Sequence, residues 1–144
     1  MQWEIRVGRS DSIYEDALSV RKTVFVEEQG VDPAIEVDDH DETAIHLAAY
    51  DDSGEPIGAG RFRTLDDRAG KVERIAVLAD HRDDGLGRAI MARIEDLARE
   101  RGIDRLVLHS QTRAAPFYER VGYERVGEEF EEAGIPHVEM RKEL

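Results

Sequence analysis

A short loop with two glycines joins an apolar strand to an amphipathic helix, and this unit restricts the fold more than any other segment. We predict the strand over 71–78 and the helix over 87–101. The apolar side chains of this helix recur at helical spacing and define its buried face: Ile90, Met91, Ile94, Leu97 and Ala98. A strand that runs into a helix in this way is typical of a fold that layers helices over a sheet.

The loop between this strand and this helix has the features of an anion site. At a helix N-terminus the backbone N–H groups are unpaired, and the helix dipole favours negative charge. Gly85 and Gly87 permit positive φ and let a phosphate approach the main chain closely. Arg82 supplies a guanidinium that can bind a phosphate through two hydrogen bonds. The loop therefore predicts a diphosphate site; the competing interpretation is a tight turn that needs glycine for its geometry alone.

Two common classes of phosphate-binding loop do not fit this sequence. The P-loop needs Gly-Lys followed by Ser or Thr, and the chain contains no such tripeptide. A dinucleotide fingerprint would place a third glycine at position 90, where Ile90 stands. A P-loop hydrolase is therefore excluded, and a dehydrogenase is a distant alternative.

Length and composition predict one globular domain over residues 1–144. The chain has no cysteine, which excludes disulfides, thiolate metal sites and a cysteine nucleophile. Its first residues lack the apolar core of a signal peptide, and no apolar stretch is long enough to span a bilayer. We therefore expect a soluble cytoplasmic protein that does not act at a membrane.

The chain carries a formal net charge of −13, with 33 acidic against 20 basic side chains. This charge argues against a nucleic-acid partner, because phosphate backbones need a basic surface. The acidic residues are spread along the chain, and Lys22, Lys71 and Lys142 are its only lysines. Such a surface either attracts a cationic substrate or is strongly hydrated and self-repelling, and we favour the second interpretation. It resembles the surface of proteins from halophilic organisms, where salt screens the repulsion.

Patterns along the rest of the chain predict further strands and helices. Ser12 to Glu15 has the form of a capping box, and the helix that it begins is expected to end at Gly30. A hairpin is expected over 44–50 and 56–64. The remaining expected elements are strands over 3–7, 104–109, 123–127 and 137–141 and a short helix over 114–121. This order predicts an α/β fold in which helices flank a mixed β-sheet.

Two signatures resemble those of the GNAT N-acetyltransferase superfamily. The spacing of Arg82, Gly85 and Gly87 after Ile75-Ala76-Val77 resembles the family's coenzyme A pyrophosphate loop. The segment 115–123 is similar to the family's Phe-Tyr-x-x-x-Gly-Phe/Tyr helix. With the order of elements, the resemblance covers nearly the whole chain and implies the acyl-CoA N-acyltransferase fold.

Two outer segments are similar to one branch of that superfamily, the ElaA-like or YjcF-like acetyltransferases. One is 21–31, with Glu36, Asp38 and His46 beyond it, and the other is 130–137. The motifs do not reveal which acceptor this branch uses.

The resemblance implies acetyl-CoA as cosubstrate. In the family the pantetheine arm lies beside the central strand and pairs with its backbone, and the diphosphate lies on the glycine loop. The residues that the resemblance assigns to the coenzyme are Ile75, Ala76, Val77, Arg82, Asp83, Asp84, Gly85, Leu86, Gly87, Arg88, Phe117 and Tyr118.

Acetyl transfer from a thioester needs a proton for the departing thiolate, and Tyr118 is the candidate donor. It matches the tyrosine that acts as general acid in many relatives. A phenol suits this role, because its proton affinity is comparable to that of a thiolate. The competing interpretation is a packing tyrosine beside Phe117 and Val121.

The reaction also needs a neutral amine, and Glu73 is the candidate base. Alternation along the central strand predicts that Glu73 and Ile75 lie on the same face. Lys71 stands where some relatives have their base glutamate, so that role does not transfer directly. Glu73 is equally well explained as a partner of Arg74 or Arg61.

An acceptor pocket would take its side chains from the branch-specific segments and from the end of the strand over 104–109. The candidates are Arg21, Glu28, Gln29, His46, His109 and His137. Each histidine is also explained as a hydrogen-bonded structural residue, and Arg21, Glu28 and Gln29 as braces of the first helix. We assign no metal, because no histidine pair has metal-ligand spacing.

These observations favour an N-acetyltransferase that moves the acetyl group of acetyl-CoA to a primary amine of a small molecule or peptide. Direct attack in a ternary complex is the expected route. The alternative is a non-catalytic acyl-CoA-binding sensor or interaction domain. The sequence leaves the oligomeric state open, a homodimer included.

Overall fold

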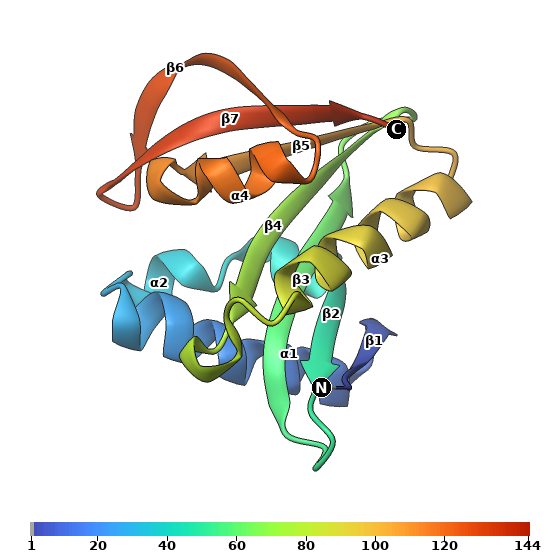
Figure 1. The fold of residues 1–144 in the computed structure, drawn as a ribbon, viewed down its shortest axis with the longest axis vertical. Helices are drawn as coiled ribbons and strands as arrows, with labels where there is room; N and C mark the ends of the chain where they lie inside the picture. The colour runs from blue at the N-terminus through green and yellow to red at the C-terminus, as the bar shows by residue number, and fades with distance from the viewer. Residues whose placement is uncertain (1) are drawn as a thin grey trace.

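Residues 2–144, the part of the chain that the computed structural model describes, form a seven-stranded mixed sheet with helices on both faces (Figure 1). The strands lie in the order β1-β2-β3-β4-β5-β7-β6, so β4 is central. β4 and β5 run parallel, and every other neighbouring pair is antiparallel. The strands are β1 (Glu4–Gly8), β2 (Ile45–Tyr50), β3 (Pro56–Thr64), β4 (Ala69–Val77), β5 (Arg105–Gln111), β6 (Glu124–Glu132) and β7 (Ile135–Glu143).

Within residues 2–144, eight helical segments lie between strands of this sheet. The α-helices are α1 (Asp11–Arg21), α2 (Pro33–Glu36), α3 (Leu86–Glu100) and α4 (Ala115–Arg120). A π-helix, η1 (Lys22–Glu28), continues α1, and the 3-10 turns are η2 (Asp39–Glu42), η3 (Ala79–His81) and η4 (Thr112–Ala114). The predicted α/β class with a mixed sheet is confirmed, as are the β2–β3 hairpin and the central position of β4.

The two faces of the sheet bury separate apolar clusters. On one face, Ile90 and Ile94 of α3 belong to the same buried cluster as Leu47 of β2. On the other, α1 packs Val20 against Ala48, the next residue along β2. Consecutive residues of one strand therefore contribute to opposite cores, and each fully buried aliphatic side chain stabilises the fold by roughly 1.5–3 kcal/mol.

The first helix differs from its predicted form at both ends. Ser10, not Ser12, is the N-cap, and its hydroxyl accepts a hydrogen bond from the backbone N–H of Ile13. The regular α-helix stops at Arg21, and the chain continues as the π-helix η1 as far as Glu28. The helical run then ends next to Gly30, which has a φ of +71°, as the stop signal predicted.

A β-bulge in the central strand separates two residues that alternation placed together. Ala59 and Arg61 of β3 pair with Ala76 and Glu73, so Arg74 and Ile75 both lie opposite Gly60. Arg74 has a φ of 57°. Ile75 packs on the α3 face near Gly60, whereas Glu73 turns to the other face and pairs with Arg61. The prediction that Glu73 and Ile75 share a face is therefore wrong.

The same region of β4 separates from its parallel neighbour. β4 and β5 pair only from Ala69 to Val72 and from Arg105 to Leu108. Beyond Leu108, β5 continues beside β7 and pairs with it as far as Gln111. The carboxyl-terminal halves of β4 and β5 therefore diverge, and the opening between them lies in the middle of the sheet (Figure 1).

Candidate active site

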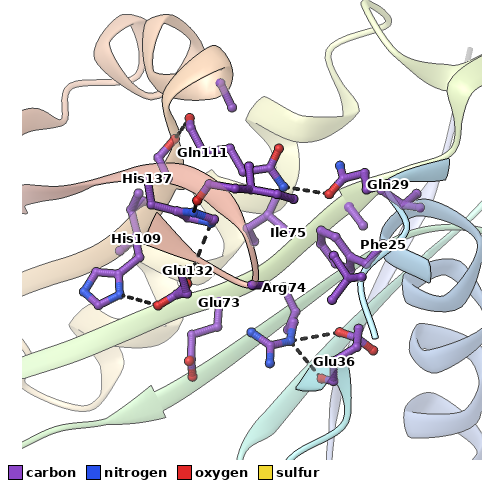
Figure 2. A pocket seen from close by; sticks show the side chains of 18 of the residues that line it. Phe25, Gln29, Glu36, Glu73, Arg74, Ile75, His109, Gln111, Glu132 and His137 are labelled. Carbon is purple, nitrogen blue, oxygen red and sulfur yellow. Dashed lines mark hydrogen bonds and ion pairs between the residues drawn. The ribbon is translucent and has the colours of Figure 1, made fainter. Parts of the chain in front are cut away.

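A cavity of about 1120 Å³ occupies the opening between β4 and β5. Its walls come from η1, α2, the diverging strands, η4, and the turn between β6 and β7. Ten of the residues predicted for a site line this cavity: Glu28, Gln29, Glu73, Ile75, Ala76, Val77, Arg82, His109, Tyr118 and His137. Figure 2 shows how five of these (Gln29, Glu73, Ile75, His109 and His137) and their neighbours converge from segments far apart in the sequence.

The predicted anion loop lies next to the cavity and ends at the first residue of α3. Gly85 is the N-cap with a φ of 90°, a conformation that a side chain would strain. Within residues 2–144 no side chain caps this helix end, so its first backbone N–H groups stay available to a ligand. Leu86 is buried in the core and offers only its backbone. These donors fit a diphosphate.

Gly87 does not have the positive φ that the sequence suggested for it. It lies in the first turn of α3 and is absent from the positive-φ glycines of residues 2–144. A Cβ at this position would lie 3.2 Å from Cζ of Phe117, so a larger residue would require the Phe117 ring to move by a few tenths of an ångström. Phe117 thus contacts the loop, although the cavity is lined by its neighbour Tyr118.

The charged side chains of the loop differ in whether they contact other protein groups. Arg82 donates through Nε to the carbonyl oxygen of Val77 at 2.9 Å, and its guanidinium pairs with Glu28 at 2.8 Å. Asp83, which has a φ of 71°, and Asp84 are exposed, as is Arg88 on the first turn of α3. Side chains of Asp83 and Asp84 would repel a phosphate, so any contribution from these two residues comes from the backbone.

Glu73 is held between two arginines. Its carboxylate lies 3.1 Å from Arg61 and 2.6 Å from Arg63, while Lys71 is 3.9 Å away. Burial alone would raise the pKa of Glu73, but the charge of Arg61 and the hydrogen bonds from both arginines lower it below its ordinary value. A carboxylate stabilised in this way is a weak proton acceptor.

Tyr118 lies on α4 and lines the cavity. Its ring packs edge-on against Phe117 at 5.0 Å and Tyr123 at 6.0 Å between ring centroids. Burial raises the pKa of the Tyr118 hydroxyl, so this group stays protonated at neutral pH. The residue therefore both packs and presents a proton donor to the cavity.

Two predicted acceptor residues, Arg21 and His46, lie behind the cavity wall rather than on it. Arg21 is fully buried; it pairs with Glu36 at 3.0 Å and holds both carboxylate oxygens of Asp41, at 2.9 and 3.1 Å. His46 Nε2 donates to the backbone carbonyl oxygen of Asp41 at 2.8 Å. Burial lowers the pKa of His46, so it stays neutral in this position.

Arg21 belongs to a buried ion-pair network beneath the cavity, and neutral His46 hydrogen-bonds to the backbone of Asp41 beside it. Arg61 joins Asp38 at 2.6 Å, Asp41 at 2.8 Å and Glu73 at 3.1 Å. Arg74 joins Glu36 at 2.9 Å and Asp38 at 3.2 Å. The branch-specific residues Glu36, Asp38 and His46 are thus structural partners, and the network sets the position of β4 at its bulge.

The upper cavity is lined by residues that sequence reasoning did not select. Gln111 at the end of β5 donates to the side chain of Gln29 at 2.6 Å, and this hydrogen bond crosses the cavity (Figure 2). Glu132 of β6 lies beside both His109 and His137. Glu132 falls within the branch-specific segment 130–137, and this position was the feature of the sequence that could have indicated a site role. No feature of the sequence indicated Gln111.

Two further expectations can be compared with the fold. Among the residues that the structure describes, no group of three or more His, Cys, Asp or Glu side chains is placed to hold a metal ion. The helices within residues 2–144 are too short or too polar to cross a membrane.

Comparisons with known proteins agree with this geometry. The chain is 41% identical over 138 residues to an uncharacterized N-acetyltransferase, YjcF, of Bacillus subtilis (strain 168), which covers 95% of this chain and 97% of that protein. The crystal structure of Escherichia coli ElaA superposes with a TM-score of 0.85 at 25% identity, covering 99% and 100% of the two chains. A protein from Lactobacillus plantarum named as an N-acetyltransferase superposes with a TM-score of 0.93 at 28% identity, covering 100% and 99%.

The family model described as "Acetyltransferase (GNAT) domain" matches residues 13–144. This range includes the loop before α3, the diverging halves of β4 and β5, and the helix that carries Tyr118. Since the match spans nearly the whole chain, the protein is an acyltransferase that belongs to the acetyltransferase (GNAT) family.

Proposed function

We propose that this chain transfers the acetyl group of acetyl-CoA to a primary amine of a small molecule or peptide, by direct attack in a ternary complex. The observation that carries the proposal is a single continuous cavity. Arg82, which lies just before the uncapped N-terminus of α3, the bulged end of β4 and Tyr118 all line it. One extended cosubstrate would contact all three.

The coenzyme would lie across the edge of the sheet. The backbone N–H groups at the start of α3 and the guanidinium of Arg82 would bind the diphosphate. The pantetheine arm would run beside Ile75, Ala76 and Val77, where β4 has lost its pairing with β5. With the coenzyme in this position, the thioester would lie between β4 and Tyr118.

Tyr118 would donate its proton to the sulfur as the thioester breaks. The hydroxyl carries its proton at neutral pH, and burial, which raises its pKa, makes it a weaker acid than a phenol in water. Glu73 would not be the base, because Arg61 and Arg63 hold it as a stabilised carboxylate. Its role would be to fix these arginines and β4 beneath the thioester.

The test is a panel of primary amines incubated with acetyl-CoA, with release of free thiol followed by a thiol-reactive dye. The chain contains no cysteine, so the protein adds no thiol signal of its own. We expect thiol release that depends on both amine and protein, and an acetylated amine in mass spectra. Binding of acetyl-CoA in calorimetry without turnover of any amine would instead support a non-catalytic acyl-CoA-binding domain.

A further inference from the structure

Three side chains from three neighbouring strands meet on the wall of the cavity. His109 of β5 donates through Nδ1 to Oε1 of Glu132 on β6, at 3.2 Å. His137 of β7 faces the other carboxylate oxygen of Glu132 with its Nε2, at 3.7 Å. Figure 2 shows Glu132 between the two imidazole rings. Phe130 packs edge-on against His109 and stacks on His137, which fixes both rings.

The tautomer of His137 follows from its backbone contact. Nδ1 lies 2.7 Å from the carbonyl oxygen of Ile135, which can only accept, so Nδ1 carries the proton. In neutral His137 the Nε2 atom then carries a lone pair. This lone pair faces the Glu132 carboxylate, which is also an acceptor, across a gap too long for a hydrogen bond. Two acceptors aimed at one space are satisfied by a ligand that brings N–H groups.

Glu132 differs from the other carboxylates that line the cavity. Glu28 pairs with Arg82, Glu36 and Asp38 pair with Arg74, and Glu73 pairs with Arg61 and Arg63. For Glu132, in contrast, the basic side chains found within 4 Å in residues 2–144 are the two histidines, which are charged only when protonated. A cation that enters the cavity can therefore bind the Glu132 carboxylate without displacing an arginine.

Other charged groups around this cluster set its state. The hydrogen bond and charge of His109, followed by the charges of His137 and of Lys71 on β4, lower the pKa of the Glu132 carboxyl, against burial, which raises it. Nε2 of His109 faces Glu139 of β7 at 3.5 Å, so both nitrogens of His109 point at carboxylates. The contacts of His109 thus orient Glu132, whereas Nε2 of His137 makes no hydrogen bond to a protein group that the structure describes.

We propose that the acceptor amine binds as an ammonium between Nε2 of His137 and the carboxylate of Glu132, and that Nε2 of His137 removes its proton. This assignment rests on the proposed function. It defines the substrate class as amines that are protonated at neutral pH, and it gives the reaction the base that Glu73 does not supply.

The proton balance is complete with groups already described. The ammonium passes one proton to Nε2 of His137, and the freed lone pair of nitrogen forms a bond to the thioester carbonyl carbon. The C–S bond then breaks with its electron pair on sulfur. Tyr118 gives its proton to the thiolate, and the surplus proton on nitrogen replaces it on the Tyr118 oxygen. His137 releases its proton to water. The net products are an amide, a free thiol and one proton.

A spectroscopic test decides the first half of the proposal without turnover. In protein labelled with ¹⁵N-histidine, with His137 assigned by comparison with His137→Gln, we expect Nδ1 protonated and Nε2 unprotonated at pH 8. Propylammonium chloride should shift the Nε2 resonance, and tetramethylammonium chloride, which has no N–H group, should not. A protonated Nε2 in the free protein, or equal shifts with both salts, would overturn the assignment.

A kinetic test decides the second half, using an amine that the panel shows to be acetylated and a fluorinated analogue of lower basicity. A general base contributes about 10²–10⁴-fold, so His137→Gln should lower kcat/KM for the strongly basic amine at least 10²-fold at pH 7. The analogue is already neutral and should lose less than about 10-fold, because it needs no base. Equal losses for both amines would mean that His137 is only structural.

Glu132→Gln should raise KM for the basic amine, and Glu131→Gln is its matched control. Glu131 is the adjacent exposed carboxylate on β6 and is absent from the cavity wall, so its variant should behave as the parent protein. Both variants, and His137→Gln, should bind acetyl-CoA with unchanged Kd. A protein that binds acetyl-CoA but acetylates no amine refutes the proposed function alone, while the spectroscopic test still decides the ammonium site.

Discussion

The guanidinium of Arg82 pairs with the carboxylate of Glu28 at 2.8 Å, and this contact joins the loop before α3 to the end of η1. Both side chains line the mouth of the cavity. A diphosphate that binds at the start of α3 competes with Glu28 for the same guanidinium. If the coenzyme binds as proposed, Glu28 would oppose its binding, both by occupying Arg82 and by its charge.

Removing that charge should strengthen binding. For Glu28→Gln we expect a Kd for acetyl-CoA that is about 2–5-fold lower in calorimetry, since exposed ion pairs contribute roughly 0.2–1 kcal/mol. Glu27→Gln, at the exposed neighbouring position, should leave Kd unchanged and controls for net charge. An unchanged or weaker Kd for Glu28→Gln would show that Arg82 does not bind the diphosphate.

Substitutions in the loop should abolish binding of acetyl-CoA while the protein stays folded. Gly85→Val opposes a φ of 90°, and Gly87→Val drives a side chain into Phe117. We expect each variant to raise Kd at least 10-fold. Gly102→Val, at the other end of α3, is the control: it has the same kind of strain at a φ of 73°, with nothing packed against it. Loss of binding in all three would point to general destabilisation instead.

Tyr118→Phe should lower kcat by about 10²-fold or more and leave the Kd for acetyl-CoA nearly unchanged. The ring still packs against Phe117 and Tyr123, but the proton donor to the departing thiolate is gone. Single-turnover rates measured beside calorimetry separate the two effects. An unaltered chemical step would reduce Tyr118 to a packing residue.

The buried network should make the fold sensitive to acid. Burial would raise the pKa of Asp38, but its hydrogen bond to Arg61 and the charges of Arg61 and Arg74 lower it from 3.8 to about 2. Because the folded-state pKa lies below the unfolded one, the stabilisation is complete above pH 4 and is lost as the pH falls toward 2. Asp38→Asn should flatten this dependence, by on the order of 1 kcal/mol in urea unfolding at pH 3 relative to pH 6. An unaltered acid profile would contradict the assignment.

Salt should stabilise the fold, because the 33 acidic side chains outnumber the 20 basic ones and ions screen the repulsion between the acidic side chains. We expect Tm to rise as sodium chloride increases from low to molar concentration. A neutral osmolyte at matched osmolality is the control, since excluded solutes stabilise proteins without screening. If the osmolyte reproduces the whole increase at low salt, charge repulsion does not limit the stability of this chain.

Local signals in the sequence were sufficient for the loop and for most elements. Gly85 needs its positive φ for reasons that lie within a few residues, and apolar periodicity located α3 and β4. Gly87 shows the limit of this reasoning: its neighbour Phe117 lies thirty positions away in the chain, so the reason for a glycine there is a tertiary contact.

The orientation of site residues depends on contacts that a single sequence does not reveal. The bulge at Arg74 shifts the register of β4 by one residue and sends Glu73 and Ile75 to opposite faces. Arg21 and His46 are residue types that can line an acceptor site. In the structure, however, Asp41 and Glu36 bind them inside the protein. The meeting of Glu132 with His137 requires the pairing of β6 with β7.

The early end of the β4–β5 ladder gives the central strand of this sheet the properties of an edge strand. Exposed edges usually invite a second protein chain to add to the sheet, and proteins cover or distort them to prevent aggregation. Here the edge is recessed: η1 and α2 flank it on one side, and the β6–β7 turn flanks it on the other. A molecule that completes the sheet at this place must therefore be extended and must enter between these flanking segments, so the architecture limits what can pair with β4.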